Sequence, residues 1–260
     1  MYHSVTFGKR NTFDDWHLVP DGRPSIIMPE PKVVTVDIPG RDGVLDLSEA
    51  LRRFPVYNNR VGTLKFHVLN DYHDWQTLYS SIANYLHGRT LQVTLEDDPN
   101  WYYTGRAWVQ NWTSNNNGTW SDIEIKYDLE PYKKYVRNSL SDNWIWDTFS
   151  FVNGRIAITR LKNISINSTS YTKVDLLGSI GTMPLCPKFI VNSSRGIDLH
   201  IYNEELGINV TKTGVTTGTH SWPEIILSER SDSNVIYVEY KNSYSSYTST
   251  LSVDYRMGSL

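Results

Sequence analysis

Three adjacent carboxylates, Glu96-Asp97-Asp98, are the residues of this sequence whose types and spacing first suggest chemistry. Two carboxyl groups about 5–9 Å apart across a sugar ring are the arrangement that most glycosidases use. Asp97 or Asp98 would be the candidate for such a role. Adjacent acids in front of Pro99 are more typical of a solvated turn. We therefore expect a structural turn and keep a glycosidase as the weaker alternative.

The sequence gives still less support for a metal site or a catalytic nucleophile than for a glycosidase. The seven histidines are scattered and form neither H-x-x-x-H nor H-E-x-x-H. Nucleophile elbows and phosphate-binding loops are absent, because Gly40-Arg41-Asp42-Gly43 lacks the following Lys-Ser/Thr and helix. The sequence predicts no catalytic residue, no metal site and no cofactor.

Aromatic residues offer a further kind of chemistry, since the chain has 9 Trp and 17 Tyr. In the second half, Trp144, Trp146 and Trp222, together with Tyr244 and Tyr247, could form a platform that stacks on sugar rings. Packing in a core or between subunits explains the same residues and is favoured. Weak carbohydrate binding by Trp144, Trp146 and Trp222 remains an alternative.

Composition and charge restrict the classes of protein. The 260 residues suffice for two domains of about 130 residues each or for one large domain. The net charge of −3 comes without a basic stripe, which argues against specific nucleic-acid binding. No run approaches the roughly 20 apolar residues of a membrane span, and the start MYHSVTFGKR has no apolar signal-peptide core. The single cysteine, Cys186, excludes an intrachain disulfide and is expected to be buried.

The acidic turn lies within a stretch that predicts helix, strand, turn and strand. Apolar residues at helical spacing predict a helix from Asn70 to Gly88, capped by Asn70 or Asp71 and ended by Gly88. Alternation over 91–95 predicts a strand, and an aromatic strand over 101–112 returns after the turn. We expect this helix to pack on an antiparallel sheet.

Shorter strands are expected in the rest of the first half, over 2–7, 11–18, 32–38, 45–47, 61–69 and 120–129. The last of these alternates strictly and is expected at an edge with one solvated face. Residues 20–31 contain too many prolines for a regular element and predict a long loop. Pro39 to Gly43 predicts a turn in which two glycines can take positive φ.

A polar, aperiodic segment, Pro131–Asn143, predicts a linker between domains 1–135 and 136–260. After it, short β-branched runs recur every 8–12 residues and predict an antiparallel β-sandwich without a helix. The expected strands are 156–161, 172–177, 188–191, 197–202, 224–227, 235–240 and 248–255.

Several short motifs, in consistent order, resemble the distal tail protein (Dit) family of long non-contractile-tailed phages (siphophages), mostly those of Gram-positive hosts. The resemblance covers about half of the chain, and no single motif carries it. Its residues are Tyr2-His3-Ser4, Phe7-Gly8, Asp15-Trp16, Val36-Asp37-Ile38-Pro39-Gly40, Asp42-Gly43, Leu45-Asp46-Leu47, Tyr57-Asn58-Asn59-Arg60, Tyr85-Leu86-His87-Gly88, Glu96-Asp97-Asp98-Pro99 and Tyr102-Tyr103-Thr104-Gly105-Arg106.

The resemblance implies a fold that is mainly β with some α. Its parts are an N-terminal α+β, β-barrel-like, ring-forming domain and a peripheral C-terminal galectin-like β-sandwich. It also implies a virion structural protein, a baseplate hub of six copies at the tail tip, assembled in the bacterial host cytoplasm. The implied partners are the tail tube protein, the tape-measure end, the tail-associated lysin or fibre, and the receptor-binding protein. It implies a structural role and no enzyme, which agrees with the charge and hydropathy patterns that predict no specific nucleic-acid binding and no membrane insertion.

Within that picture, the turn residues Asp37, Gly40, Arg41, Asp42 and Gly43 are expected at the contact between neighbouring subunits. Two glycines permit a close backbone approach, and Arg41 and Asp42 offer opposite charges for exchange between copies. An ordinary exposed hairpin turn explains the same residues. The alternative function is a host-polysaccharide-binding module of the phage adhesion device.

Overall fold

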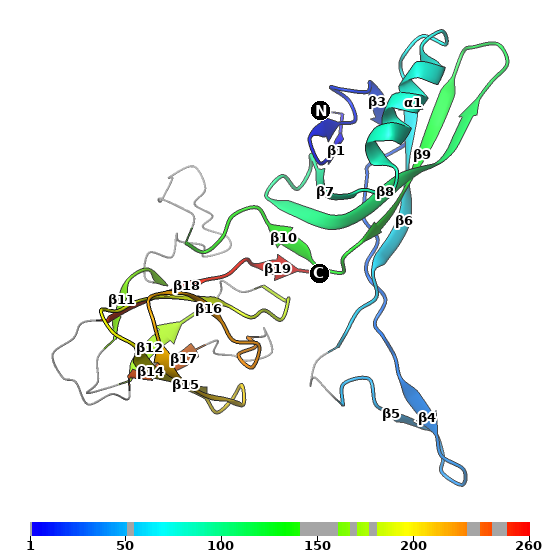
Figure 1. Ribbon diagram of the computed structural model, residues 1–260. Helices are drawn as coiled ribbons and strands as arrows, with labels where there is room; N and C mark the ends of the chain where they lie inside the picture. Colours follow the sequence, from blue (N-terminus) through cyan, green and yellow to red (C-terminus); the bar gives the residue numbers. More distant parts are fainter. Residues whose placement is uncertain are drawn as a thin grey trace. The chain divides into compact units, whose positions relative to one another are not determined.

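The computed structural model describes residues 2–50, 55–140, 161–166, 171–176, 181–227, 235–240 and 249–260. The chain is mainly β, and the described residues include one α-helix (Figure 1). It divides into two compact units, Met1–Lys134 together with Leu260, and Tyr135–Ser259.

The first unit is built on an antiparallel sheet with strand order β2-β1-β7-β8-β9-β6-β3, and β10 pairs with β8 beside this path. Its strands are β1 (Val5–Phe7), β2 (Arg10–Asn11), β3 (Leu18–Pro20), β6 (Arg60–Val68), β7 (Thr90–Leu95), β8 (Trp101–Ser114), β9 (Ser121–Leu129) and β10 (Lys133–Tyr135).

Strand β9 shows how the sequence pattern builds this core. Ile123, Ile125, Tyr127 and Leu129 are buried while the residues between them are half-buried, as period-two alternation requires. The strand lies between β8 and β6, so the expectation of an edge strand was wrong. Alternation reports that one face is buried, but it does not report how many neighbours a strand has.

The helix α1 (Trp75–Leu86) packs against β8. The rings of Tyr79 and Trp112 meet edge to face, with their centres 5.4 Å apart. The helix begins five residues later than expected, because Asp71 binds the backbone N–H of His73 in a local turn. Asp74 is the N-cap and makes no side-chain capping bond. Gly88 has φ of +72° and follows the helix as the sequence predicts.

The segment between β2 and β3 connects strands that lie near opposite ends of the sheet path. The expected strand over 11–18 does not form: residues 12–16 make a turn between β2 and β3, and Trp16 is buried in the core. Buried Thr12 receives the Val5 N–H on its hydroxyl oxygen and the Leu18 N–H on its carbonyl oxygen. One residue therefore links strands β1 and β3, which lie near opposite ends of the sheet path.

A two-stranded hairpin, β4 (Thr35–Asp37) and β5 (Val44–Asp46), forms a sheet of its own. Figure 1 shows it at the end of two extended segments that leave the sheet after β3 and return into β6. Bridges between these segments, such as Pro31 with Tyr57, hold them together. We call residues 27–50 and 55–58 the arm.

The second unit contains two four-stranded antiparallel sheets, β11-β18-β13-β16 and β12-β17-β14-β15. Side chains from both sheets share one hydrophobic core that includes Phe189, Val191, Ile201 and Val238. This is the sandwich that the sequence predicts. The strands are β11 (Ile164–Ile166), β12 (Thr172–Asp175), β13 (Lys188–Asn192), β14 (Ile197–Asn203), β15 (Ile208–Val215), β16 (Gly218–Ser221), β17 (Val235–Tyr240) and β18 (Ser249–Asp254). A further short strand, β19 (Gly258–Ser259), follows them.

Several expectations for the second unit were wrong in detail. The segment 224–227 is not a strand, although Leu227 bridges to Leu185. Strands β11, β15 and β16 were missed, because polar Ser, Thr and Asn residues interrupt their apolar pattern. The expected linker also begins with a strand, β10. The expected strand over 156–161 lies almost entirely outside the described residues.

Candidate functional site

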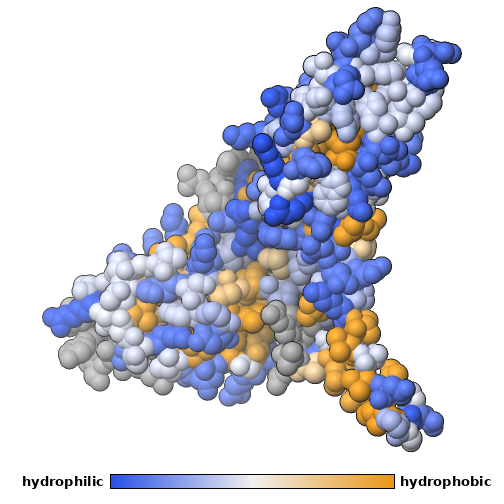
Figure 2. Space-filling view, turned by 45° about the vertical axis from the view of Figure 1, so that its right-hand side comes forward, coloured by the Kyte–Doolittle hydropathy of each residue, from blue (hydrophilic) through white to orange (hydrophobic). Residues whose placement is uncertain are grey.

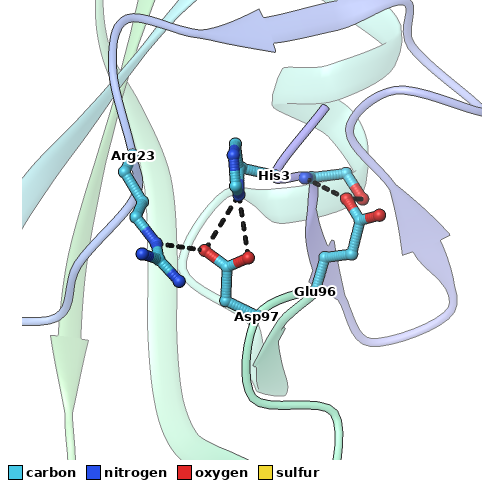
Figure 3. Close-up of polar contacts among 5 residues, drawn as sticks. His3, Arg23, Glu96 and Asp97 are labelled. Carbon is cyan, nitrogen blue, oxygen red and sulfur yellow. Dashed lines mark hydrogen bonds and ion pairs between the residues drawn. The ribbon is translucent and has the colours of Figure 1, made fainter. Parts of the chain in front are cut away.

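The acidic turn is held by the N-terminal segment and the loop after β3 (Figure 3). Asp97 accepts a 2.8 Å hydrogen bond from Arg23 Nε, and its Oδ1 lies 2.8 Å from His3 Nδ1. Glu96 accepts the backbone N–H of Ser4 at 2.7 Å and its hydroxyl at 3.0 Å. The turn therefore ties the start of the chain to the β7–β8 connection.

Asp98, the third acid of the turn, forms an ion pair with Lys133, whose Nζ lies 2.7 Å from Asp98 Oδ2. The same ammonium lies 5.1 Å from the centre of the Trp101 ring. Hydrogen bonds from Arg23 and then His3 hold the pKa of Asp97 below its usual value. A glycosidase needs one carboxyl group with a raised pKa to protonate the leaving group. Asp97 has the opposite shift, and all three acids are occupied by structural contacts.

In the part of the chain that the structure describes, histidine and carboxylate side chains meet in small sets. Three such pairs are His3 with Asp97, His67 with Asp122 and His200 with Glu239. Within the described residues no group of three or more metal-ligating side chains is found. The helix that the structure describes is too short to cross a membrane.

The expected interface residues lie on the arm. Asp37, Gly40, Arg41, Asp42 and Gly43 are all exposed at the β4–β5 turn, which is closed by a hydrogen bond from Arg41 N to Ile38 O. Gly40 and Gly43 have φ of +86° and +72°, so the turn uses the freedom that only glycine supplies cheaply.

Apolar side chains follow this turn along the hairpin, which the sequence analysis did not anticipate. They are 40% to 66% exposed, and Figure 2 shows them gathered on the arm at its lower right. The residues are Val33, Val34, Val36, Val44 and Leu47. Contiguous exposed apolar surface of this kind usually marks a contact with another molecule.

The proposed tryptophan platform receives no support from Trp222. This ring is 9% exposed and lies in the core, stacked against Phe189 with ring centres 5.0 Å apart. Trp144 and Trp146, like Tyr244 and Tyr247, lie outside the described residues.

Cys186 is exposed, so the expectation of a buried thiol was wrong. It alternates with buried Leu185 and Pro187 and therefore points away from the core. Its Sγ donates to the carbonyl oxygen of Trp222 at 3.1 Å.

Arg60 is a buried residue whose position the sequence analysis missed. It is 1% exposed at the start of β6, where Nε donates to Pro131 O at 2.8 Å and Nη1 donates to Ile27 O at 2.7 Å. Burial lowers the pKa of Arg60, and its Nη2 has no hydrogen-bond partner. Arg60 therefore fixes the base of the arm through backbone carbonyls. The signal in the sequence was its position: in β6 every second residue from Leu64 to Val68 is buried, and Arg60 is in step with them.

The fold assembled from these elements is shared with a phage tail protein of known structure. That protein is Dit (gp 19.1) of phage SPP1, whose crystal structure is described as a paradigm of the hub adsorption apparatus in phages that infect Gram-positive bacteria. The similarity covers 100% of both chains, with a TM-score of 0.62 and 12% sequence identity. No protein-family model matches the sequence, and no curated protein matches it. At this identity the likeness is one of fold, and it confirms the resemblance that the motifs indicate.

Proposed function

We propose that the protein is a structural component of a phage tail tip. In this proposal six copies form a hub ring between the tail tube, with the tape-measure end, and the tail-associated lysin or fibre and receptor-binding protein. The observation that carries the proposal is the full-length similarity of fold to SPP1 Dit, which includes both units. The protein would be assembled in the host cytoplasm and reside in the virion.

The arm supports this proposal because its exposed apolar side chains suit a contact between neighbouring subunits of the ring. Burying one exposed valine or leucine side chain contributes roughly 1.5–3 kcal/mol, and the arm offers five of them. In a cyclic ring one face of each subunit meets a different face of the next. Arg41 and Asp42 form no ion pair among the described residues, so both remain available to a neighbouring copy or another tail protein.

The direct test is the number of copies and their position in the tail. Purified tail tips, averaged from electron micrographs, should show six copies around the axis. Val36→Asp combined with Val44→Asp should prevent assembly without lowering the melting temperature, because both side chains are exposed. Val136→Asp is the matched control, since Val136 is similarly exposed but lies outside the arm. Three copies per tail, or copies on fibres away from the axis, would refute the hub.

The proposal includes the absence of catalysis, which the engaged carboxylates support. Incubation with host cell-wall polysaccharide and peptidoglycan should release no reducing ends. Release that disappears in Asp97→Asn or Asp98→Asn would overturn this part of the proposal and favour the glycosidase.

A further inference from the structure

The outer face of the sheet β12-β17-β14-β15 carries a cluster that the tail-hub proposal does not use. Val174, Ile201 and Val238 point into the core, so the alternating residues of these strands point outward. In register across the sheet, Tyr237 pairs with Lys173 and Tyr202, and Tyr202 pairs with Asn209. The neighbouring row pairs Glu239 with His200. We call Tyr171, His200, Tyr202, Asn209, Tyr237 and Glu239 the tyrosine face.

The rings of the tyrosine face form an ordered stack. His200 stacks on Tyr202 with ring centres 4.9 Å apart, and Tyr202 stacks on Tyr237 at 5.3 Å. The ring plane of Tyr171 makes an angle of 81° with that of Tyr237, and Tyr171 is 57% exposed. The stack therefore presents ring edges and hydroxyl groups, and Tyr171 extends it with a differently oriented ring.

Polar contacts fix the groups between the rings. Glu239 Oε2 lies 3.1 Å from His200 Nδ1. The Tyr202 hydroxyl donates to Glu239 Oε1 at 3.4 Å. His200 Nε2 lies 2.9 Å from Asn209 Oδ1. Burial and then the charge of Glu239 raise the pKa of Tyr202, so its hydroxyl keeps its proton at neutral pH. These contacts hold donors and acceptors in place before any ligand arrives.

We propose that the tyrosine face is a carbohydrate-binding site that takes a neutral sugar ring of a polysaccharide. Sugar hydroxyls both donate and accept, which matches a carboxylate acceptor, an amide and phenolic hydroxyls. The C–H surface of a pyranose packs on the face of an aromatic ring, which suits Tyr171, because its ring stands at 81° to Tyr237 outside the face-to-face stack. Tyrosines also supply rigid contact area at a low cost in conformational entropy. The negative charge of Glu239 disfavours phosphate-bearing polymers, and among the described residues one lysine, Lys173, is in register with the face.

A protein partner suits this face less well. The cores of protein interfaces are enriched in tyrosine but depleted of carboxylates, whereas the tyrosine face contains Glu239 and no aliphatic member. The arm of the first unit has the opposite character, with exposed valines and a leucine. The proposal is independent of the hub ring, because a monomeric protein would bind the sugar equally.

The experiment uses the full-length protein on an array of bacterial oligosaccharides. The probes are neutral hexose and N-acetylhexosamine oligomers, with phosphate-bearing glycans beside them. Saturable binding of a neutral oligomer is expected, followed by titration of that oligomer by NMR. Tyr237→Ala should weaken its affinity about tenfold or more, the loss of about 1.4 kcal/mol. Asn209→Ala should weaken it severalfold.

The variants separate binding from folding. Asn209 is exposed, so its truncation leaves the core intact even if Tyr237→Ala destabilises the unit. Ile190→Ala, on the outer side of the other sheet, is the matched control and should bind as the original protein does. No saturable glycan, or equal affinity in folded Tyr237→Ala and Asn209→Ala, would overturn the site. Preference for phosphate-bearing glycans, or tail proteins captured in place of sugars, would also refute it.

Discussion

His67 shows how a single exposed residue couples this protein to pH. Its Nδ1 lies 2.6 Å from Asp122 Oδ1, and its Nε2 lies 3.5 Å from Asp21 Oδ1. The hydrogen bond to Asp122 is the main cause of a raised pKa at His67. A group whose pKa is higher in the folded than in the unfolded state stabilises the fold in its protonated form.

The sign of the effect follows from this shift. The contribution of His67 should be complete below its unfolded pKa of about 6.5 and lost as pH rises through the raised folded value. Both side chains are exposed, so screening keeps the effect below about 1 kcal/mol. Urea midpoints should therefore show Asp122→Asn less stable than the original protein at about pH 5.5 and nearly equal to it in alkali. An NMR titration that places the His67 pKa at or below 6.5 would contradict the assignment.

Arg60 makes a second prediction at the residue scale. Arg60→Met removes the charge but leaves the carbonyl groups of Ile27 and Pro131 without this donor, which costs at most about 1–3 kcal/mol for each, and less where water reaches the carbonyl. Hydrogen exchange at the Ile27 amide, which donates to the Tyr127 hydroxyl, should accelerate as the base of the arm loosens.

Arg41→Met is the control for this change, because Arg41 is exposed on the arm and forms no ion pair among the described residues. It should leave the melting temperature and the exchange rate unchanged. An Arg60→Met protein as stable as the original would show that the buried guanidinium is not what fixes the arm.

At the scale of elements, the β4–β5 turn is the part whose geometry depends most on its residue types. A β-branched residue at positive φ is strained by about 1–3 kcal/mol. Gly40→Val with Gly43→Val should therefore reshape the turn, while open space around both positions avoids any clash with the core. Because the strain falls on the arm, the second unit should fold and melt as in the original, and the variant should fail to form tail tips.

Gly22→Val is the matched control, since Gly22 also has positive φ and open surroundings but lies outside the arm. It should assemble normally. Normal tails from the double variant would remove this turn from the subunit contact and leave the ring itself standing.

The same scale shows how far sequence patterns reach in this chain. Strong local signals placed the core of helix α1, the turn glycine Gly88 and the alternation of β9 correctly. Properties set by distant neighbours were missed: β9 is internal, and Cys186 is exposed. The acidic turn was correctly expected to be structural, but its partners His3 and Arg23 are 94 and 74 residues away in the chain.

The residues of the proposed tyrosine face were missed for a related reason. The tyrosine face was visible as alternation in His200-Ile201-Tyr202 and Tyr237-Val238-Glu239, yet only strand register joins these two segments. The abundance of tryptophan pointed instead to Trp222, which is a core residue. Register and burial are tertiary properties, and residue type alone does not report them.

At the scale of the whole molecule, the two units have separate hydrophobic cores. The cluster of the first unit runs from Val5 to Leu129, and that of the second from Leu140 to Tyr255. Because neither cluster includes a buried side chain of the other unit, each unit has the means to fold alone. We therefore predict that residues 1–135 and 136–260 are independent domains.

The two pieces, expressed separately, should each unfold in one cooperative transition near a transition of the full chain. In the intact chain, limited proteolysis should cut first after β10, within residues 136–143, because Lys133 is held by Asp98 and Trp101. First cuts within β7 or β8 would contradict the boundary, as would a piece that unfolds alone while the full chain stays folded.

The separated domains also distinguish the two functions proposed for this chain. If the arm builds the ring, residues 1–135 should incorporate into tail tips, and Val36→Asp with Val44→Asp should prevent it. If the tyrosine face binds sugar, residues 136–260 should keep the affinity of the full chain for the neutral oligosaccharide, because all members of that face lie in this piece. A first domain that assembles beside a second domain that binds no sugar would leave the hub and remove the carbohydrate site. The reverse result would leave a polysaccharide-binding module and remove the ring.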